Sequence, residues 1–189
     1  MNSDFMERVY IIALGGAGAR VLKALTMLLS AGALPNYEIV PIIIDFDRCN
    51  GDVKQTLDLL NRYKTIQNRC QPAQEIGFLH SSLLTIGALH HGIANQYSFM
   101  VDIPMHHAMN IGHLLGYHSL VPQTPFKQLL DSLITTAPME EMDYNMVIGF
   151  GGNAKLASLG YAALGIEDTF EFRTFLNCII PNRDKVVVV

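Results

Sequence analysis

The chain has 189 residues, of which half are hydrophobic and 16% are charged, and its formal net charge at pH 7 is −4. This composition predicts a folded chain with a sizeable core and excludes a disordered or low-complexity one. A mildly acidic chain lacks the basic stripe that a nucleic-acid-binding surface needs. No apolar run approaches the roughly 18 residues of a membrane-spanning helix, and the acidic N-terminus is unlike a secretory signal.

The sulfur and imidazole groups suggest neither a disulfide framework nor a metal centre. The three cysteines, Cys49, Cys70 and Cys178, are odd in number, far apart and form no CxxC pair, so we expect reduced thiols in a cytoplasmic protein. The histidines between residues 106 and 118 lack the spacing of a zinc site and are interpreted as loop residues.

The first 35 residues predict a strand followed by a helix. Residues 9–14 form a short apolar run rich in β-branched side chains, which is typical of a strand buried on both faces. Glycines then interrupt the run, and helical spacing begins at Ala19 and stops before Gly32 and Pro35. With Thr26 on the opposite side, we expect one buried face made of Val21, Leu22, Leu25, Leu28 and Leu29.

A second strand and helix follow. Residues 39–44 are apolar, and Pro41 within them favours an edge strand or a bulge. Residues 53–63 place their apolar side chains on one helical face, and Asn50 is a suitable N-cap for that helix. Because strand and helix alternate in this way, we predict an α/β fold of Rossmann-like type, with three layers and a mostly parallel sheet.

The rest of the chain is less regular. Residues 71–125 show no clean period and predict an irregular insertion, followed by an amphipathic helix at 126–134. After an apolar run at 144–150, Asn153 is the expected N-cap of a further helix. The final valines, placed after a turn at Pro181 and Asn182, predict a buried parallel strand. A buried strand is an unusual end for a domain, so we interpret residues 1–189 as one incomplete domain and expect the natural protein to continue.

The turn between the first strand and helix contains Gly15, Gly16 and Gly18, with the small Ala17 among them. Glycine permits positive φ and lets a phosphate approach the backbone, while the helix dipole favours an anion by about 0.3–1 kcal/mol. The alternative is a tight turn that binds nothing. A G-x-G-x-x-G motif starting at Gly16 would need glycine where Val21 stands, and no segment has the P-loop pattern.

Two further segments follow apolar runs. Asp45 and Asp47 come after residues 39–44, and residues 151–153 come after residues 144–150. If both runs are strands of one parallel sheet, these segments lie with the glycine turn at the same edge. The two carboxylates would need a cation such as Mg²⁺ beside a phosphate, although Asp is also common in capped turns. Arg20 could reach a phosphate or cover the sheet with its stem, and Asn153 is expected mainly as a helix cap.

In this order along the chain, the segments LGGAGARV, IIDFDRCNGDV, GFGGNAKLASLG and KVVVV resemble the nucleotide-binding part of the tubulin/FtsZ family. The chain looks most like bacterial tubulin-like proteins of uncertain role. In that family the first loop touches the nucleotide phosphates, the second lies near the phosphates and magnesium, and a Gly-Gly-Asn loop approaches the terminal phosphate. The resemblance thus implies a nucleotide-binding set made of Gly15, Gly16, Ala17, Gly18, Arg20, Asp45, Asp47, Gly151, Gly152 and Asn153.

The resemblance implies GTP or GDP as the ligand, Mg²⁺ as the cation and a second copy of the chain as the partner. The family's glycine-threonine-glycine signature loop does not occur in these residues, so we do not expect them to hydrolyse GTP alone and assign no catalytic residue. Two alternatives remain open. One is a Rossmann-type NAD-binding oxidoreductase module with Asp45 or Asp47 on the ribose, and the other is an interaction scaffold that binds no nucleotide.

Overall fold

The computed structural model describes residues 7–34, 37–47, 49–70, 78–89, 99–101, 103, 110–133, 142–150, 152–165 and 169–189. The chain divides into two compact units. We call them the sheet unit (Met1–Asp45, Cys49–Asp102 and Phe170–Val189) and the helical unit (Phe46–Arg48 and Ile103–Thr169). That residues 1–189 form a single domain with an insertion at 71–125 stays a prediction.

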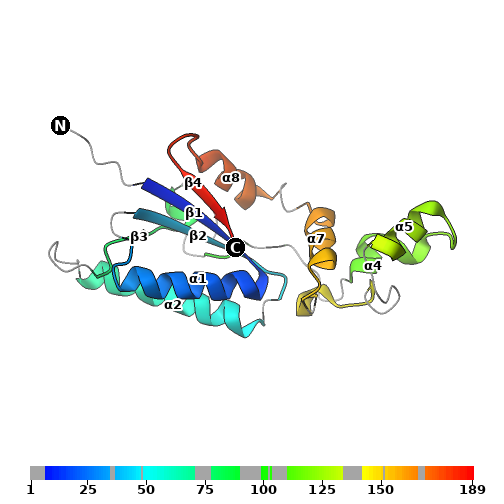
Figure 1. The fold of residues 1–189 in the computed structure, drawn as a ribbon, viewed down its shortest axis with the longest axis horizontal. Coiled ribbons are helices and arrows are strands. Elements are labelled where there is room, and N and C mark those ends of the chain that lie inside the picture. The colour runs from blue at the N-terminus through cyan, green and yellow to red at the C-terminus, as the bar shows by residue number, and fades with distance from the viewer. Residues whose placement is uncertain are drawn as a thin grey trace. The chain divides into compact units, whose positions relative to one another are not determined.

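A four-stranded parallel sheet forms the centre of the sheet unit, in the order β3-β2-β1-β4 (Figure 1). Strand β1 (Glu7–Leu14) pairs along its whole length with β2 (Tyr37–Ile44). The short β3 (Ser82–Leu83) pairs with the other side of β2, and β4 (Lys185–Val188) pairs with the other side of β1. The predicted α/β fold with a parallel sheet is confirmed.

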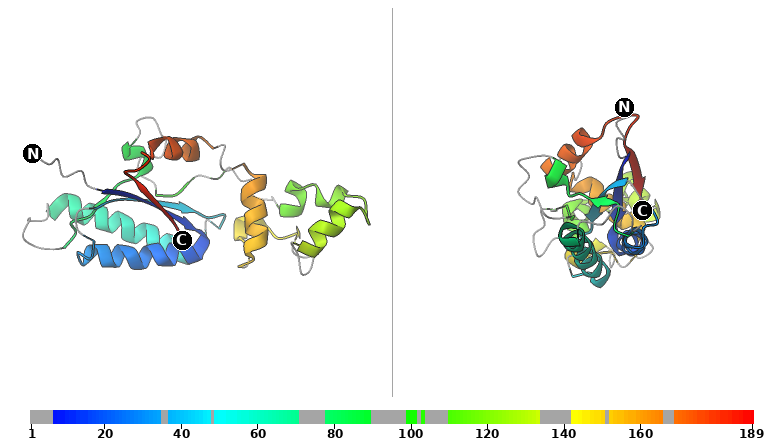
Figure 2. Two further views of the ribbon diagram at one scale, coloured as in Figure 1. Left: turned by 45° about the horizontal axis from the view of Figure 1, so that its top comes forward. Right: turned by 90° about the vertical axis from the view of Figure 1, so that its left-hand side faces the viewer.

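Helices cover both faces of this sheet in a Rossmann-like layering (Figures 1 and 2). Helices α1 (Gly15–Ser30) and α2 (Gly51–Cys70) lie side by side on one face, and α8 (Phe170–Cys178) lies on the other, in contact with α3 (Ile86–Leu89). The core beneath α1 and α2 contains Ile11, Ala13, Ala19, Leu22, Leu29, Ile39, Ile43, Val53, Leu60, Tyr63, Leu83 and Phe99.

The opposite face of the sheet packs against α8. Side chains alternate along a strand, so Tyr10 points away from its neighbour Ile11 and toward this helix. The Tyr10 ring lies 5.3 Å from that of Phe175, and its hydroxyl donates to the Cys178 carbonyl at 3.1 Å. Helix α8 has no counterpart among the predicted elements, although Phe172, Phe175 and Leu176 have the i, i+3, i+4 spacing of a helix face.

Helix α1 begins earlier than predicted, at Gly15, directly after β1. Its predicted buried face is partly wrong, because Val21 and Leu28 are more than half exposed whereas Thr26 is 1% exposed. The Thr26 hydroxyl donates to the Leu22 carbonyl at 2.8 Å, so burial leaves no polar group unsatisfied there.

Strand β2 lies inside the sheet, so the edge position predicted from Pro41 is wrong, and its continuous register with β1 contains no bulge. The sheet tolerates the proline because β3 pairs only with Glu38 and Ile39. The Ile39 carbonyl accepts a hydrogen bond from Leu84, which shows that this residue faces the β3 side. Pro41 faces the same side two residues later, so its missing N–H interrupts no bond of the β2–β3 ladder.

Strand β4 is parallel, as predicted, but it is not buried. It lies at an edge of the four-stranded sheet, and Val186, Val187 and Val188 expose 44%, 44% and 61% of their surface. A run of valines thus indicates a strand, whereas burial depends on what lies beside it. The expectation that the natural protein continues stays a prediction.

The helical unit contains α4 (Ile111–Leu114), α5 (Pro125–Leu133), α7 (Ala154–Ala163) and two 3₁₀ turns, η1 (Tyr117–Ser119) and η2 (Met146–Ile148). Helices α5 and α7 confirm the two helices predicted in this part of the chain. The apolar run at 144–150 forms η2 instead of a strand, and Phe150 packs its ring 5.2 Å from that of Phe46. Met146 and Phe150 are buried in the helical unit, whereas Tyr144 and Ile148 are at least half exposed.

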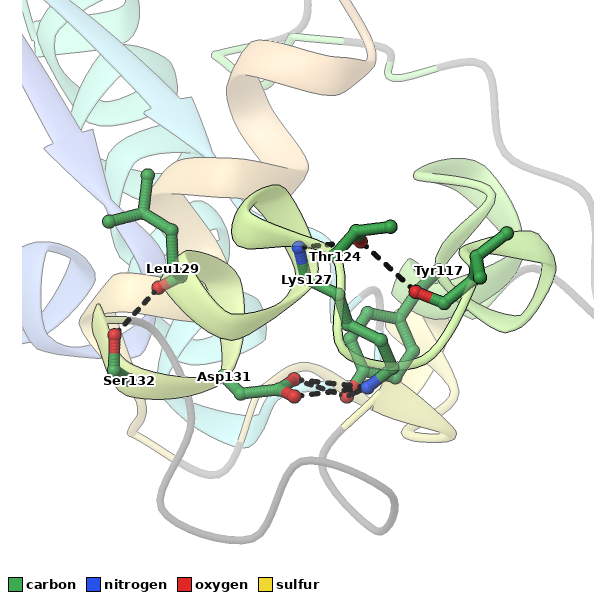
Figure 3. Close-up of polar contacts among 7 residues, drawn as sticks. Tyr117, Thr124, Lys127, Leu129, Asp131 and Ser132 are labelled. Carbon is green, nitrogen blue, oxygen red and sulfur yellow. Dashed lines mark hydrogen bonds and ion pairs between the residues drawn. The ribbon is translucent and has the colours of Figure 1, made fainter.

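A polar cluster joins α5 to η1 (Figure 3). Tyr117 is 2% exposed and donates its hydroxyl to Asp131 Oδ1 at 2.5 Å, while Lys127 Nζ lies 2.8 Å from that hydroxyl and 3.0 Å from Asp131 Oδ2. The hydrogen bonds from Tyr117 and Lys127 lower the pKa of Asp131, whereas burial raises the pKa of Tyr117. Because every group in it has a partner, we assign this cluster a structural role in anchoring α5.

Candidate functional site

The candidate site is the turn where β1 enters α1. Gly15 there has a φ of +62°, a left-handed conformation that favours glycine. Leu14 is the N-cap residue of α1 and supplies no side-chain hydrogen bond, and the first turn of the helix contains no acidic residue. The N–H groups of this turn therefore carry the partial positive charge of a helix N-terminus, with no carboxylate of the turn itself to neutralise it.

The strand order places this turn at a switch point of the sheet. The chain builds β2 and β3 on one side of β1 and then adds β4 on the other side. In open α/β sheets, ligands bind outside the carboxyl ends of the strands at the point where the order reverses. The Leu14 N–H donates to the Val189 carbonyl at 2.9 Å, so β1 and β4 end together beside the glycine turn.

Gly18 lets the first turn of α1 pack directly onto these strand ends. A Cβ at this position would lie 2.6 Å from the Val189 carbonyl oxygen and 2.8 Å from the Ala13 carbonyl carbon. Both neighbours are backbone atoms, which cannot rotate away as a side chain can. Packing therefore requires glycine at position 18 whether or not the turn binds a ligand.

Gly16 faces Asn50, the residue that precedes α2. A Cβ on Gly16 would lie 2.5 Å from Asn50 Nδ2. Asn50 Oδ1 accepts a hydrogen bond from the Asp52 N–H at 2.9 Å, which confirms the predicted cap, and Nδ2 donates to Asp45 Oδ2 at 3.1 Å. Asp45 is 7% exposed at the end of β2. One side chain thus connects the glycine turn, Asp45 and the start of α2.

Arg20 projects toward α2. Its Nη1 lies 3.1 Å from Asp52 Oδ2, and one turn further along Lys23 Nζ donates to Gln55 Oε1 at 2.6 Å. The structure therefore shows Arg20 in a polar contact between the helices, beside those of Lys23 with Gln55 and of the Thr56 hydroxyl with the Ala19 carbonyl. The Arg20 side chain is 66% exposed, and an exposed ion pair contributes only about 0–1 kcal/mol, so exchanging Asp52 for an anionic ligand costs little.

Ala17, also predicted, is exposed in the first turn of α1, and Gly151 lies outside the described residues. The remaining predicted site residues, Asp47, Gly152 and Asn153, belong to the helical unit. Asn153 Oδ1 accepts from the N–H groups of Lys155 and Leu156 at 3.2 Å each, which confirms the predicted cap of α7. Gly152 is exposed with a φ of +85°, and Asp47 is half-buried. Because residues 144–150 are not a strand of the sheet, the argument for a shared edge does not apply to residues 151–153. Their part in nucleotide binding stays a prediction.

Asp45 suits Mg²⁺ chemically. Magnesium in nucleotide sites is usually held by one or two carboxylates, with phosphates and waters completing its shell. Within the described part of the chain, His, Cys, Asp and Glu form no group of three or more that could hold a metal by themselves. A cation at Asp45 would therefore depend on the ligand's phosphates for its remaining oxygens. Asn50 was predicted only as a helix cap and Asp52 was not singled out. The structure adds the contact of Asn50 with Gly16 and that of Asp52 with Arg20.

Comparisons of the chain with protein-family models, with curated proteins and with solved structures gave no match. No helix among the described residues is long and apolar enough to cross a membrane.

Proposed function

We propose that the first turn of α1 binds the phosphate groups of a nucleotide. The carrying observation is the glycine turn itself, which has no acidic residue and no side-chain cap and lies where the strand order reverses. Phosphate oxygens are the ligands that first-turn N–H groups and the positive end of a helix dipole favour. Arg20 lies within the same helix and adds a positive charge that Asp52 holds only weakly.

We further propose that the nucleotide is GTP or GDP and that it binds with Mg²⁺. The need for a cation is supported by Asp45, since an ionised carboxylate near a phosphate repels it unless a cation lies between them. The preference for guanine rests on the resemblance to the tubulin/FtsZ family. Self-association has the same basis, as does the expectation that these residues do not hydrolyse GTP by themselves. Sedimentation and phosphate release in the presence of GTP test the two.

The decisive experiment places a carboxylate in the proposed phosphate position. Ala17 is exposed in the first turn of α1, so Ala17→Glu should not disturb packing and should stabilise the helix by about 0.3–1 kcal/mol through its dipole. At about 5 Å in water, each pair of like charges costs about 0.8 kcal/mol. A triphosphate carries several charges, so the affinity should fall at least about tenfold.

Ala24→Glu is the matched control, because Ala24 is exposed on the same helix but lies well beyond its first turn. Calorimetric titrations with GTP and GDP in excess Mg²⁺ should show binding to the wild-type chain and to Ala24→Glu, and weak or no binding to Ala17→Glu. If the two variants bound GTP with equal affinity, the phosphates would not bind at this turn and the proposal would be wrong.

A second candidate is NAD. The order β3-β2-β1-β4 is also that of a dinucleotide-binding half, and Asp45 ends β2, as a ribose-binding acid would. The same titrations carried out with NAD distinguish the two: binding of NAD that Asp45→Ala abolishes, with no binding of GTP, would favour the dinucleotide. If none of GTP, GDP and NAD bound, the result would favour an interaction scaffold.

A further inference from the structure

We infer that Asn50 is a positioning residue of the proposed phosphate site, which sets where the Asp45 carboxylate stands relative to the first turn of α1. This inference rests on the proposed function. It goes further because it assigns the magnesium dependence of binding to a residue that contacts neither phosphate nor metal in the proposal.

The geometry of Asn50 carries the inference. Both ends of its amide are engaged, Oδ1 with the Asp52 N–H at 2.9 Å and Nδ2 with Asp45 Oδ2 at 3.1 Å. The same Nδ2 occupies the space that a Cβ on Gly16 would enter, at 2.5 Å. A change at either Gly16 or Asn50 must therefore alter the hydrogen bond to Asp45.

The position of Asp45 matters because of its charge. A carboxylate fixed beside a phosphate site disfavours the bare anion and favours the anion bound to Mg²⁺, since the cation then bridges the two negative groups. If Asn50 no longer donates to Asp45, the carboxylate loses the hydrogen bond that directs it toward the glycine turn, and the site should lose part of this selectivity. The expected signature is therefore a change in the ratio of GTP affinity with Mg²⁺ to GTP affinity in EDTA. A residue that only caps α2 would not change that ratio.

Asn50→Ser separates the two roles of Asn50. Serine is also a strong N-cap, so α2 keeps its first hydrogen bond, but its hydroxyl is shorter than the amide and cannot serve Asp45 at the same time. Gly16→Ala, in α1, should also break the hydrogen bond from Asn50 to Asp45, because the new methyl group displaces the Asn50 side-chain amide. Gly51→Ala is the matched control, since no atom lies within 4 Å of a Cβ at that position.

The experiment measures GTP affinity by calorimetry, with Mg²⁺ and with EDTA, for the wild type, both single variants, their double variant and the control. Asn50→Ser and Gly16→Ala should each reduce the magnesium-dependent gain in affinity at least about tenfold. The double variant should lose no more than either alone, because residues in contact do not act additively. Gly51→Ala should bind as the wild type does. Circular dichroism melts verify that each variant is folded.

Two failures can be told apart. A wild-type chain that binds no nucleotide would overturn the proposed function and the inference together. A wild-type chain that binds GTP with Mg²⁺, beside an Asn50→Ser variant with the same dependence on Mg²⁺, would leave the phosphate site standing and reduce Asn50 to a helix cap. Additive losses in the double variant would also refute the inference, because Gly16 and Asn50 would then act separately.

Discussion

Replacing Gly18 by alanine tests whether this glycine serves packing. The new methyl group would lie 2.6 Å from the Val189 carbonyl oxygen and 2.8 and 2.9 Å from two backbone atoms of Ala13. All three distances are shorter than van der Waals contact, and none of these atoms belongs to a movable side chain. To make room, α1 must shift away from β1 and β4.

Two opposing effects determine the size of the change. Alanine is favoured over glycine inside a helix by about 1 kcal/mol. Forcing an extra methyl into a packed site costs about 1–3 kcal/mol, and backbone neighbours place this site at the upper end of that range. We therefore expect Gly18→Ala to destabilise the sheet unit by about 2 kcal/mol. Gly51→Ala, whose methyl would meet open space in the first turn of α2, should instead stabilise it by about 0.4–1 kcal/mol.

Native-state hydrogen exchange at the amides of β1 is the appropriate assay. The chain contains two units that need not unfold together, so a single melting curve does not isolate the sheet unit. The amide of Leu14, bonded to the Val189 carbonyl, reports directly on the contact that alanine would disturb. If the β1 amides of Gly18→Ala exchange as slowly as those of the wild type, or more slowly, the new methyl group fits without displacing α1. The packing argument is then wrong.

Three further predictions concern local groups. Asn153→Ala should weaken amide protection in α7 by about 1 kcal/mol, because two first-turn N–H groups lose their acceptor, and Asn153→Ser should restore most of it. Below about pH 4 the helical unit should lose stability, since the hydrogen bond from Tyr117 lowers the pKa of Asp131 and protonation of Asp131 abolishes that advantage. Amide exchange in α5 should show this loss of protection in the wild type and not in Asp131→Asn. Burial raises the pKa of Tyr63 to about 12, so the sheet unit should lose stability as the pH rises from about 10 toward 12, and an unchanged profile in Tyr63→Phe would contradict this.

The features predicted correctly from the sequence depend on nearby residues. The strands at 9–14 and 39–44 are signalled by short runs of branched side chains, and Asn50 and Asn153 cap helices through hydrogen bonds to residues two or three positions away. Such interactions form wherever the local sequence occurs, so they can be predicted without knowing what the segment packs against. Alternation of these elements was enough to predict a parallel α/β sheet.

The wrong predictions all concern what packs beside an element. The valines of β4 form a strand in any environment that pairs it, but nothing local tells that it lies at a sheet edge. The apolar run at 144–150 contains a 3₁₀ turn and buries Met146 and Phe150 in the helical unit instead of joining the sheet. Thr26 lies on the buried face of α1 with Ala19, Leu22 and Leu29, although its polarity had placed it on the exposed side; its hydroxyl bond to Leu22 makes this burial tolerable.

The glycine turn contains both kinds of information. From the sequence alone, a strand that runs through small residues into a helix predicts a tight turn with exposed N–H groups, since only such residues allow it. The tertiary structure shows that glycine is needed at each of the three positions for a different reason. Gly15 has a positive φ, Gly16 leaves room for Asn50, and Gly18 allows backbone to meet backbone at the ends of β1 and β4. The last two reasons could not be predicted because they depend on residues about 35 and 170 positions away, which only the folded sheet brings to this turn.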